Sequence, residues 1–386
     1  MKYTKIFSFL TLLLVMAFAG CQNDNLNSVN GPVEGNNLQS LAKRGSNVQA
    51  VYTLSNSITD NKVIMYKRSA DGSLSYAGAF STGGTGTGSG LGSQGALELD
   101  GNFIFAVNAG SNEVSVLSVS SSGLSLVDKE NSGGSEPISL TTYGNLLYVL
   151  NAGGSGNITG FAINRDGTIS QISGSTQLLS SSSAGPAQIE FSPDGKVLVV
   201  TEKATNSIDT YTVGSDGIAS GPNVQASAGD TPYGFDFSSR GYLIVSDAYS
   251  GNSLAGAMSS YNVSTSGISL ISGPIYNTQT APCWVAITKN GRFAYTTNTG
   301  TSNISGYKIG YDGSLTLFND GGNTASTGAG SAPIDMAVSN NSQYLYVLSH
   351  GTNTISVFGI NDGQGGLNSV QTVSGLSSST VGLVAN

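Results

Sequence analysis

The chain has 386 residues, 53 of them glycine and only 10% charged, and this composition excludes a mainly helical fold, whose exposed faces draw on Glu, Lys and Arg. Hydrophobic residues make up 38% of the chain, which is enough for a core, so the body is not disordered. Acidic residues outnumber basic ones by 23 to 15 and the basic ones are scattered, so nucleic-acid binding, which needs a basic stripe, is not expected.

The start of the chain has the pattern of an export signal. Two lysines precede an apolar run over residues 6–19, and Ala-Gly-Cys21 follows. A basic start, a short apolar stretch and small residues before a cut are typical of a secretory signal, and the run is short for a membrane helix. A cysteine at this place resembles the bacterial lipobox, in which the thiol is acylated. We expect a lipoprotein signal peptide over residues 1–20 and lipidation of Cys21; the alternative is a plain secretory signal with a chance cysteine.

The next segment, residues 21–46, is rich in Asn, Gly, Ser and Gln and shows almost no periodicity. Such a composition predicts a flexible tether between the lipid and the body. With Cys21 acylated, Cys283 has no intramolecular partner, so the exported body is expected to do without disulfides. These features predict a bacterial envelope protein at the outer membrane, periplasm or cell surface, held by its N-terminal lipid.

From residue 47 to residue 386 the sequence is one repetitive domain. The clearest unit begins at Pro186, and its relatives lie 46 to 51 residues apart. The relatives begin at Pro137, Pro232, Pro282 and Pro333, with weaker copies near Ser93 and Val48. Each copy holds four short apolar or alternating runs separated by turn residues, the pattern of four strands. Asp-Gly pairs, which suit tight hairpins, follow the third run in four copies, at residues 71–72, 166–167, 216–217 and 312–313.

This period with four strands per unit predicts an all-β fold, a β-propeller of four antiparallel strands per blade. Second strands are predicted at 51–55, 103–108, 146–151, 197–202, 243–247, 293–298 and 344–349, which makes seven blades. The first copy lacks an inner strand, and residues 380–386 match the inner strands of the other copies. We therefore expect the C-terminal strand to join blade 1 and close the ring. A closed ring needs no partner for its edges, so a monomer is expected.

Aligning the repeats brings one residue of each second-strand end to an equivalent position on one rim. These positions are Ser55, Asn108, Asn151, Glu202, Asp247, Asn298 and Ser349. Turn chemistry accounts for the Asn and Ser residues. Glu202 and Asp247 lie on adjacent blades, and two carboxylates at a central mouth suit general acid/base chemistry or, with neighbouring Asn, a divalent cation. The alternative is a structural ion pair or solvated rim charges.

Other residues are predicted at the same mouth. Tyr249 would add a hydroxyl next to the acids, and Lys203, Gln188, Tyr233, Trp284 and Asn298 are candidate ligand-binding residues. Trp284 would offer a stacking surface for a sugar or peptide, although packing between blades is the alternative. Gln94, Cys283 and Asp335 follow from the same alignment. The sole histidine, His350, supports neither a metal site nor a catalytic triad, so no metal is assigned. The stretch 83–92 lacks the Lys-Ser/Thr of a phosphate cradle and is expected to be a loop.

Three motifs carry a family resemblance. They are Phe191-Ser-Pro-Asp-Gly-Lys196, Tyr295-Thr-Thr-Asn298 and Tyr346-Val-Leu-Ser349. Over residues 47–386 the chain resembles the seven-bladed propeller lactonases, which include propeller-type 6-phosphogluconolactonases and 3-carboxymuconate-lactonising enzymes. The resemblance implies a lactonase-like hydrolase with a His, Arg and Glu cluster at the channel.

This chain departs from the resemblance in its charges. Its five arginines fall away from the predicted mouth in the repeat alignment, and only Lys203 brings positive charge there. Phosphorylated and tricarboxylate substrates are therefore poor fits, and an unphosphorylated lactone or sugar is the better expectation. Two hypotheses remain. One is a hydrolase with Glu202 as base and with Asp247 and Tyr249 positioning water and substrate. The other is a non-catalytic propeller that binds a glycan or a protein.

Overall fold

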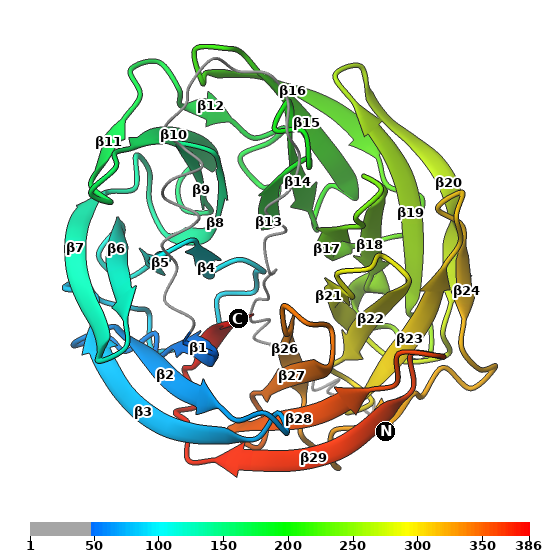
Figure 1. Cartoon of the computed structure of the whole chain (residues 1–386). Helices are drawn as coiled ribbons and strands as arrows, with labels where there is room; N and C mark the ends of the chain where they lie inside the picture. Colours follow the sequence, from blue (N-terminus) through cyan, green and yellow to red (C-terminus); the bar gives the residue numbers. More distant parts are fainter. Residues whose placement is uncertain (1–47) are drawn as a thin grey trace, which may run out of the picture.

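Residues 48–386 are described by the computed structural model and form seven antiparallel sheets around a central axis (Figure 1). The signal peptide, Cys21 and tether predicted over residues 1–46 lie outside the described residues. Each sheet is one blade with four main strands, so the predicted all-β, seven-bladed propeller is confirmed. Within residues 48–386 the one helical element is the single turn η1 (Tyr249–Gly251), and no helix is long and apolar enough to cross a membrane.

The strands occupy the same four positions in every blade. The inner strands of blades 2 to 7 are β4 (Leu97–Asp100), β8 (Pro137–Tyr143), β13 (Pro186–Phe191), β17 (Pro232–Phe237), β21 (Pro282–Ile287) and β26 (Pro333–Val338). The second strands of blades 1 to 7 are β1 (Ala50–Leu54), β5 (Phe103–Asn108), β9 (Leu146–Asn151), β14 (Val197–Glu202), β18 (Leu243–Asp247), β22 (Phe293–Asn298) and β27 (Tyr344–Ser349). These bounds agree with the predicted second strands to within one residue.

The outer half of each blade completes the sheet. The third strands are β2 (Lys62–Arg68), β6 (Glu113–Ser120), β10 (Asn157–Ile163), β15 (Ser207–Val213), β19 (Ala257–Ser264), β23 (Asn303–Ile309) and β28 (Thr354–Ile360). The outer strands are β3 (Leu74–Ser81), β7 (Gly123–Asn131), β11 (Ile169–Gln171), β16 (Ala219–Ala226), β20 (Gly267–Tyr276), β24 (Leu315–Leu317) and β29 (Leu367–Ser374). In blades 3 and 6 a short further strand also pairs with the third strand, namely β12 (Gln177–Leu178) and β25 (Ala325–Ser326).

The ring is closed by β30 (Val381–Ala385), which lies beside β1 in Figure 1 and is the inner strand of blade 1. Thr53 Oγ1 of β1 donates to Gly382 O at 2.6 Å. Arg68 Nη2 donates to Asn386 O at 2.9 Å and so ties β2 to the residue after β30. The predicted closure by the C-terminal strand is confirmed, and β1 has no free edge that could pair with another chain.

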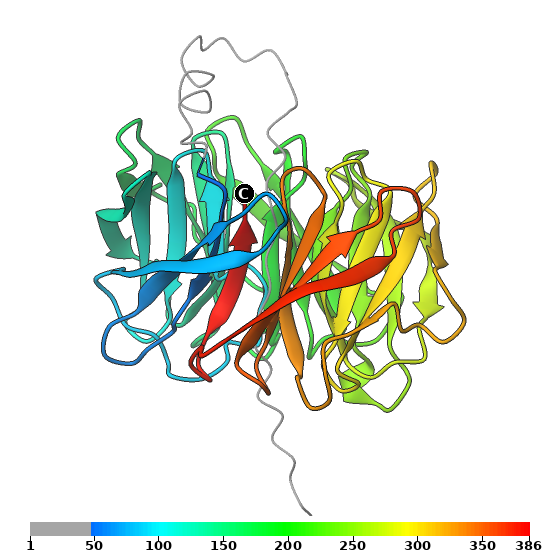
Figure 2. The same cartoon turned by 60° about the horizontal axis from the view of Figure 1, so that its bottom comes forward.

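Successive strands run in opposite directions, so the connections alternate between two faces of the ring (Figure 2). We call the crossing face the one that holds the segments from each outer strand to the next inner strand, together with the loops between second and third strands. The opposite face, which holds the remaining hairpins, is the hairpin face. Pro186 pairs with Glu202 and Pro232 pairs with Asp247. The start of each inner strand and the end of its second strand therefore meet on the crossing face, as the alignment predicts.

Neighbouring blades contact each other closely on the hairpin face. Gly72, in the hairpin between β2 and β3, has φ +84°, and a Cβ there would lie 2.2 Å from the ring of Tyr344 in blade 7. The hydroxyl of the buried Tyr346 donates to Gly72 O at 3.2 Å, and Tyr148 OH of blade 3 donates in the same way to Gly217 O of blade 4 at 2.7 Å. Each such tyrosine fills the space between two blades with its ring and bonds to the next blade with its hydroxyl.

Candidate functional site on the crossing face

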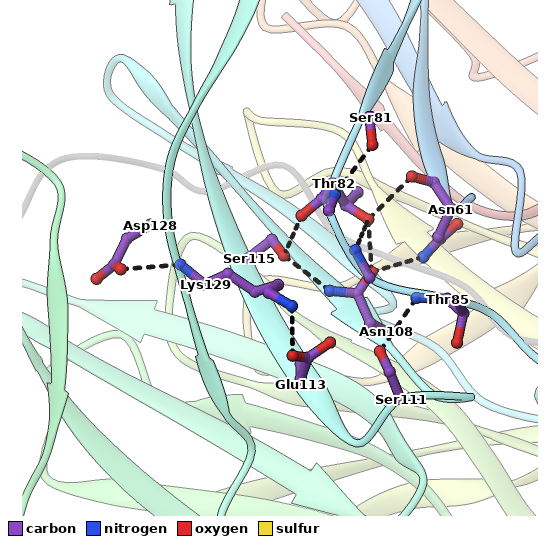
Figure 3. Close-up of polar contacts among 12 residues, drawn as sticks. Asn61, Ser81, Thr82, Thr85, Asn108, Ser111, Glu113, Ser115, Asp128 and Lys129 are labelled. Atoms are coloured by element: carbon purple, nitrogen blue, oxygen red, sulfur yellow. Dashed lines mark hydrogen bonds and ion pairs between the residues drawn. The ribbon is translucent and has the colours of Figure 1, made fainter. Parts of the chain in front are cut away.

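A polar residue ends the second strand of blades 2 to 7 on the crossing face, and Asn108 of blade 2 shows what it does (Figure 3). Asn108 Oδ1 accepts hydrogen bonds from Asn61 Nδ2 at 3.0 Å and from Thr82 Oγ1 at 2.7 Å, and Asn108 Nδ2 donates to Ser115 Oγ at 2.7 Å. Asn61 precedes β2 of blade 1, Thr82 begins the segment that crosses to blade 2, and Ser115 lies on β6. The side chain therefore fastens two blades together, a longer-range role than the local turn bond expected from sequence.

The same arrangement recurs at Asn298 in blade 6. Asn298 Oδ1 accepts from Asn277 Nδ2, in the segment that crosses from blade 5, at 3.1 Å. Asn298 Nδ2 donates to Asn303 Oδ1 at 2.7 Å and to Ser305 Oγ at 2.8 Å, both on β23. Asn298, a candidate ligand-binding residue, is fully buried and engaged with side chains of the protein.

Glu202 occupies the equivalent position in blade 4. Its carboxylate accepts hydrogen bonds from Ser180 N at 3.0 Å, from Ser180 Oγ and from Thr205 Oγ1 at 2.7 Å. Ser180 belongs to the segment that crosses from blade 3. Asp209 of β15 lies beside Glu202, and burial together with the neighbouring carboxylate raises the pKa of Asp209 to about 8. Glu202 and Asp209 therefore lie together as buried carboxyl groups, and Asp209 keeps its proton at neutral pH.

Asp247 has different partners in blade 5. Its Oδ2 accepts from Ser259 Oγ of β19 at 2.6 Å, and the crossing segment is so close that a Cβ on Gly229 would lie 2.3 Å from Asp247 Cγ. Burial raises the pKa of Asp247 to about 7. The ring of Tyr249, two residues later, packs against Tyr276 with 5.6 Å between centroids.

The structure thus gives Glu202 and Asp247 separate partners inside blades 4 and 5, and neither side chain reaches solvent. Tyr249 lies on the crossing face but packs against the outer strand of its blade. A shared catalytic role for these three residues at a central mouth stays a prediction.

The axis of the ring is crossed by residues 91–96, which lead into β4 (Figure 1). Hydrogen bonds tie this segment to three blades. In blade 3, Ser93 Oγ donates to Ile138 O at 2.8 Å and Leu140 N donates to Gly95 O at 2.7 Å. Gln94 N donates to Ala187 O of blade 4 at 2.8 Å, and Gln94 Nε2 donates to Val285 O of blade 6 at 3.2 Å. Ser93 and Gln94 are fully buried. The protein's own chain therefore occupies the axis here, and a ligand would meet the mouth from the crossing face.

Polar side chains on the inner strands satisfy the backbone of the next inner strand. Gln188 Oε1 accepts from Phe235 N at 2.7 Å, and Gln188 Nε2 donates to Phe235 O at 2.9 Å. Asp236 Oδ2 accepts from Ile287 N at 2.9 Å. An inner strand has one edge without a neighbouring strand, so its backbone groups need such partners. Gln188, a candidate ligand-binding residue, is used here to join blades 4 and 5.

Lys203 brings a positive charge to the crossing face beside the axis. Its Nζ donates to Gly92 O at the start of the central segment and lies 4.8 Å from the centre of the Tyr233 ring. The residue as a whole is half-buried, and burial of its amine lowers the pKa of Lys203 to about 8. An amine with this pKa is partly neutral just above pH 7, so it can take up a proton as well as attract an anion.

Tyr233, Cys283 and Trp284 pack beneath Lys203. The Tyr233 and Trp284 rings lie 5.3 Å apart and each side chain is 1% exposed, so Trp284 offers no open face to a ligand. Burial raises the pKa of the Cys283 thiol to about 12, and Thr299 Oγ1 lies 3.2 Å from its Sγ. The packing alternative for Trp284 and Cys283 fits these contacts.

The arginines are held away from this mouth. Arg240 and Arg292 precede β18 and β22 on the hairpin face, Arg165 lies in the β10–β11 hairpin, and Arg68 bonds to Asn386; Arg44 lies outside the described residues. His350 Nε2 contacts Ser378 O, and Asp335 is fully buried. In the part of the chain that the structure describes, no three His, Cys, Asp or Glu residues gather as they would around a metal ion.

The family follows from comparison with known proteins. The family model described as "Lactonase, 7-bladed beta-propeller" matches residues 45–183, 155–256 and 263–382. Together these segments span most of the chain. The chain belongs to this lactonase family. The resemblance drawn from the repeat motifs is thereby confirmed.

Several solved structures share the fold of this chain at low sequence identity. A putative 6-phosphogluconolactonase from Bacteroides fragilis is 18% identical over 88% of this chain and 98% of its own, with a TM-score of 0.66. A periplasmic gluconolactonase from Pseudomonas aeruginosa is 16% identical over 86% of this chain and 98% of its own, with a TM-score of 0.67. No curated protein matches the chain. At these identities the likeness shows the fold alone.

Proposed function

We propose that this lactonase propeller is a lipid-anchored protein of the bacterial envelope that hydrolyses an unphosphorylated lactone or related cyclic sugar ester at the mouth around Lys203. The observation that carries the proposal is the place of the Lys203 amine, which donates to Gly92 O beside the axis and lies over the Tyr233 ring, together with its pKa, which burial lowers to about 8. The arginines of the described residues lie elsewhere, so a phosphate or tricarboxylate would lack the bidentate partners that such groups require. A periplasmic gluconolactonase shares the fold, and it suggests glucono-δ-lactone as one compound to test.

The chemistry asks for one proton acceptor next to the lactone carbonyl. The neutral Lys203 amine takes a proton from water, and the hydroxide adds to the carbonyl carbon. The bond between that carbon and the ring oxygen then breaks, and the ring oxygen leaves with the proton from the Lys203 ammonium, which gives a hydroxy acid. Because Glu202 is shielded from solvent, it acts as a positioning residue for the strand end that carries Lys203.

The test is a screen of the full chain, purified in detergent, against glucono-δ-lactone, galactono-γ-lactone and 6-phosphogluconolactone. We expect turnover of a neutral lactone, with a rate above the uncatalysed background that rises with pH through about 8 as Lys203 loses its proton. Lys203→Met should lower kcat/KM by about a hundredfold, the usual scale for loss of a general base. Lys196→Met, which removes an exposed lysine on the hairpin face, is the matched control and should change nothing.

Two outcomes would contradict parts of this proposal. Unchanged turnover in Lys203→Met would remove the lysine from the mechanism. Loss of turnover in Glu202→Gln, with an unchanged melting temperature and an active Lys203→Met variant, would return catalysis to the carboxylates. The anchor is tested separately: Cys21→Ser should move the protein from the membrane fraction to the soluble fraction.

A second candidate function is binding without catalysis, to a glycan or a protein. The burial of Glu202 and Asp247 and the chain that fills the axis favour it. The same screen separates the two functions, since a non-catalytic propeller would turn over none of the lactones.

A further inference from the structure

Blade 5 departs from the repeat in one loop of the crossing face. Residues 248–256 join β18 to β19, a connection of nine residues, whereas residues 299–302 and 350–353 make the same connection in blades 6 and 7 with four. It is the longest of the seven loops of this kind in the described structure. In repeat proteins, an insertion confined to one unit commonly lies on the binding face.

The loop has a strained backbone that its neighbours hold in place. Tyr249 and Ser250 have φ values of 48° and 54°, two consecutive left-handed residues that are not glycine. Tyr249 N donates to Asp230 O and Ser250 N donates to Thr231 Oγ1, both at 3.0 Å. Leu254 N, farther along the loop, donates to Thr280 Oγ1 at 3.0 Å. Left-handed residues with side chains cost about 1–2 kcal/mol each, and such strain is typically retained where it serves a site.

The strained turn presents aromatic surface to solvent. The Tyr249 ring packs on Tyr276, at the end of β20, with 5.6 Å between centroids and an angle of 42° between the ring planes. Their hydroxyl oxygens are 3.0 Å apart, which fixes the two rings relative to each other. Tyr276 is 53% exposed and Leu254, at the far end of the loop, is 58% exposed. Tyr148 and Tyr346, which pack between blades, are by contrast fully buried.

We propose that Tyr249, Tyr276 and the loop 248–256 form a binding site for a neutral carbohydrate chain, separate from the Lys203 mouth. A sugar ring packs its C–H groups on an aromatic face and directs its hydroxyls to neutral polar groups. The loop supplies such groups from Ser250, Asn252 and Ser253, which are all exposed.

The charge and size of the surface select this occupant. The loop and the two adjoining segments, 227–232 and 276–281, contain one charged residue, Asp230, and no basic one. An anionic membrane surface is bound by clusters of Lys and Arg. A stable protein interface covers about 800 Å² on each partner. Tyr249, Leu254 and Tyr276, which are separated by polar residues, offer a smaller apolar surface than that. Both of those partners fit poorly, and a neutral saccharide fits well.

The test is calorimetric titration of the full chain, in detergent, with neutral pentasaccharides of glucose, mannose, galactose and xylose. We expect at least one to bind, and Tyr276→Ala to weaken it about tenfold, the scale for loss of one aromatic contact. Tyr276→Phe keeps the ring and should retain most of the affinity. Tyr311→Ala is the matched control, because Tyr311 is an 85% exposed tyrosine in the β23–β24 hairpin on the opposite face.

Binding by none of the pentasaccharides would overturn the proposal, as would equal losses in Tyr276→Ala and Tyr311→Ala. The lactonase hypothesis is tested independently, by lactone turnover rather than by saccharide binding. Lys203→Met should leave pentasaccharide binding unchanged, and Tyr276→Ala should leave lactone turnover unchanged. A melting temperature for each variant separates loss of the site from loss of the fold.

Discussion

Glu202 and Asp209 lie side by side inside blade 4, and neither carboxyl group reaches solvent. Between the ordinary carboxyl pKa of 3.8 and the raised value of about 8, folded Asp209 keeps a proton that the unfolded chain has released. Folding therefore takes up protons in this range, so the free energy of unfolding falls as pH rises from about 4 to 8. Asp247, with its pKa raised to about 7, contributes in the same direction over pH 4 to 7.

Replacing Asp209 should remove much of this pH dependence. In Asp209→Asn an uncharged amide replaces the protonated carboxyl group, and it can still donate to Glu202. We expect the melting temperature of the variant to change less between pH 5 and 8 than that of the wild type, and to exceed it at pH 8. Asp71→Asn is the control, since Asp71 is exposed and hydrogen bonds from Ser73 lower its pKa. A variant destabilised equally at both pH values would contradict a protonated Asp209 in the folded protein.

The position of each strand-end residue was predictable, whereas the direction of its side chain was not. Position follows from the repeat, because a turn residue ends each second strand. Direction depends on partners far along the chain, such as Ser180 for Glu202 and Ser259 for Asp247. One signal was present in the sequence. The third residue of the third strand is also polar in six blades, as Ser115, Thr159, Asp209, Ser259, Ser305 and Ser356. Two aligned polar positions on adjoining strands indicate a buried cluster rather than a ligand site.

At the scale of strands and hairpins, the sequence predicts most of what the structure shows. Proline starts five inner strands and Asp-Gly marks the outer hairpins, because both signals depend on local backbone geometry. The path of residues 91–96 across the axis was missed, since it depends on bonds to blades 3, 4 and 6 that form only once the ring is assembled. For the same reason the sequence could not decide whether Trp284 is buried between blades or exposed at the mouth.

The hairpin glycines offer a test of how blades contact one another. Gly72→Ala places a Cβ at φ +84° against the Tyr344 ring, so we expect it to cost both left-handed strain and a displaced blade contact, about 2–4 kcal/mol in all. Gly101→Ala is the matched control, because Gly101 has φ +57° and nothing within 4 Å of a Cβ. It should cost about 1 kcal/mol. Urea unfolding measures both, and equal losses would show that the Tyr344 contact adds nothing.

For the whole molecule, stability depends on each blade having two neighbours. Blades 1 and 7 are distant in the sequence, yet Tyr344 OH of blade 7 donates to Ala70 O of blade 1 at 2.8 Å. Blade 1 itself joins residues from both ends of the described chain, since β30 pairs with β1. The ring is therefore held shut by strand pairing within blade 1 as well as by packing between blades.

Deletion of residues 381–386 should open the ring. It removes the strand that pairs with Val51–Leu54 and the acceptors of Thr53 and Arg68, and it leaves a buried, apolar edge on β1 exposed. An unpaired edge of this kind recruits other chains. We expect the truncated protein to melt at a lower temperature and to form dimers or larger species in light scattering. A synthetic peptide of residues 379–386 should restore the monomer, and a peptide of the same composition in scrambled order should not. A truncated chain that stays monomeric with an unchanged melting temperature would mean that packing between blades alone holds the ring closed.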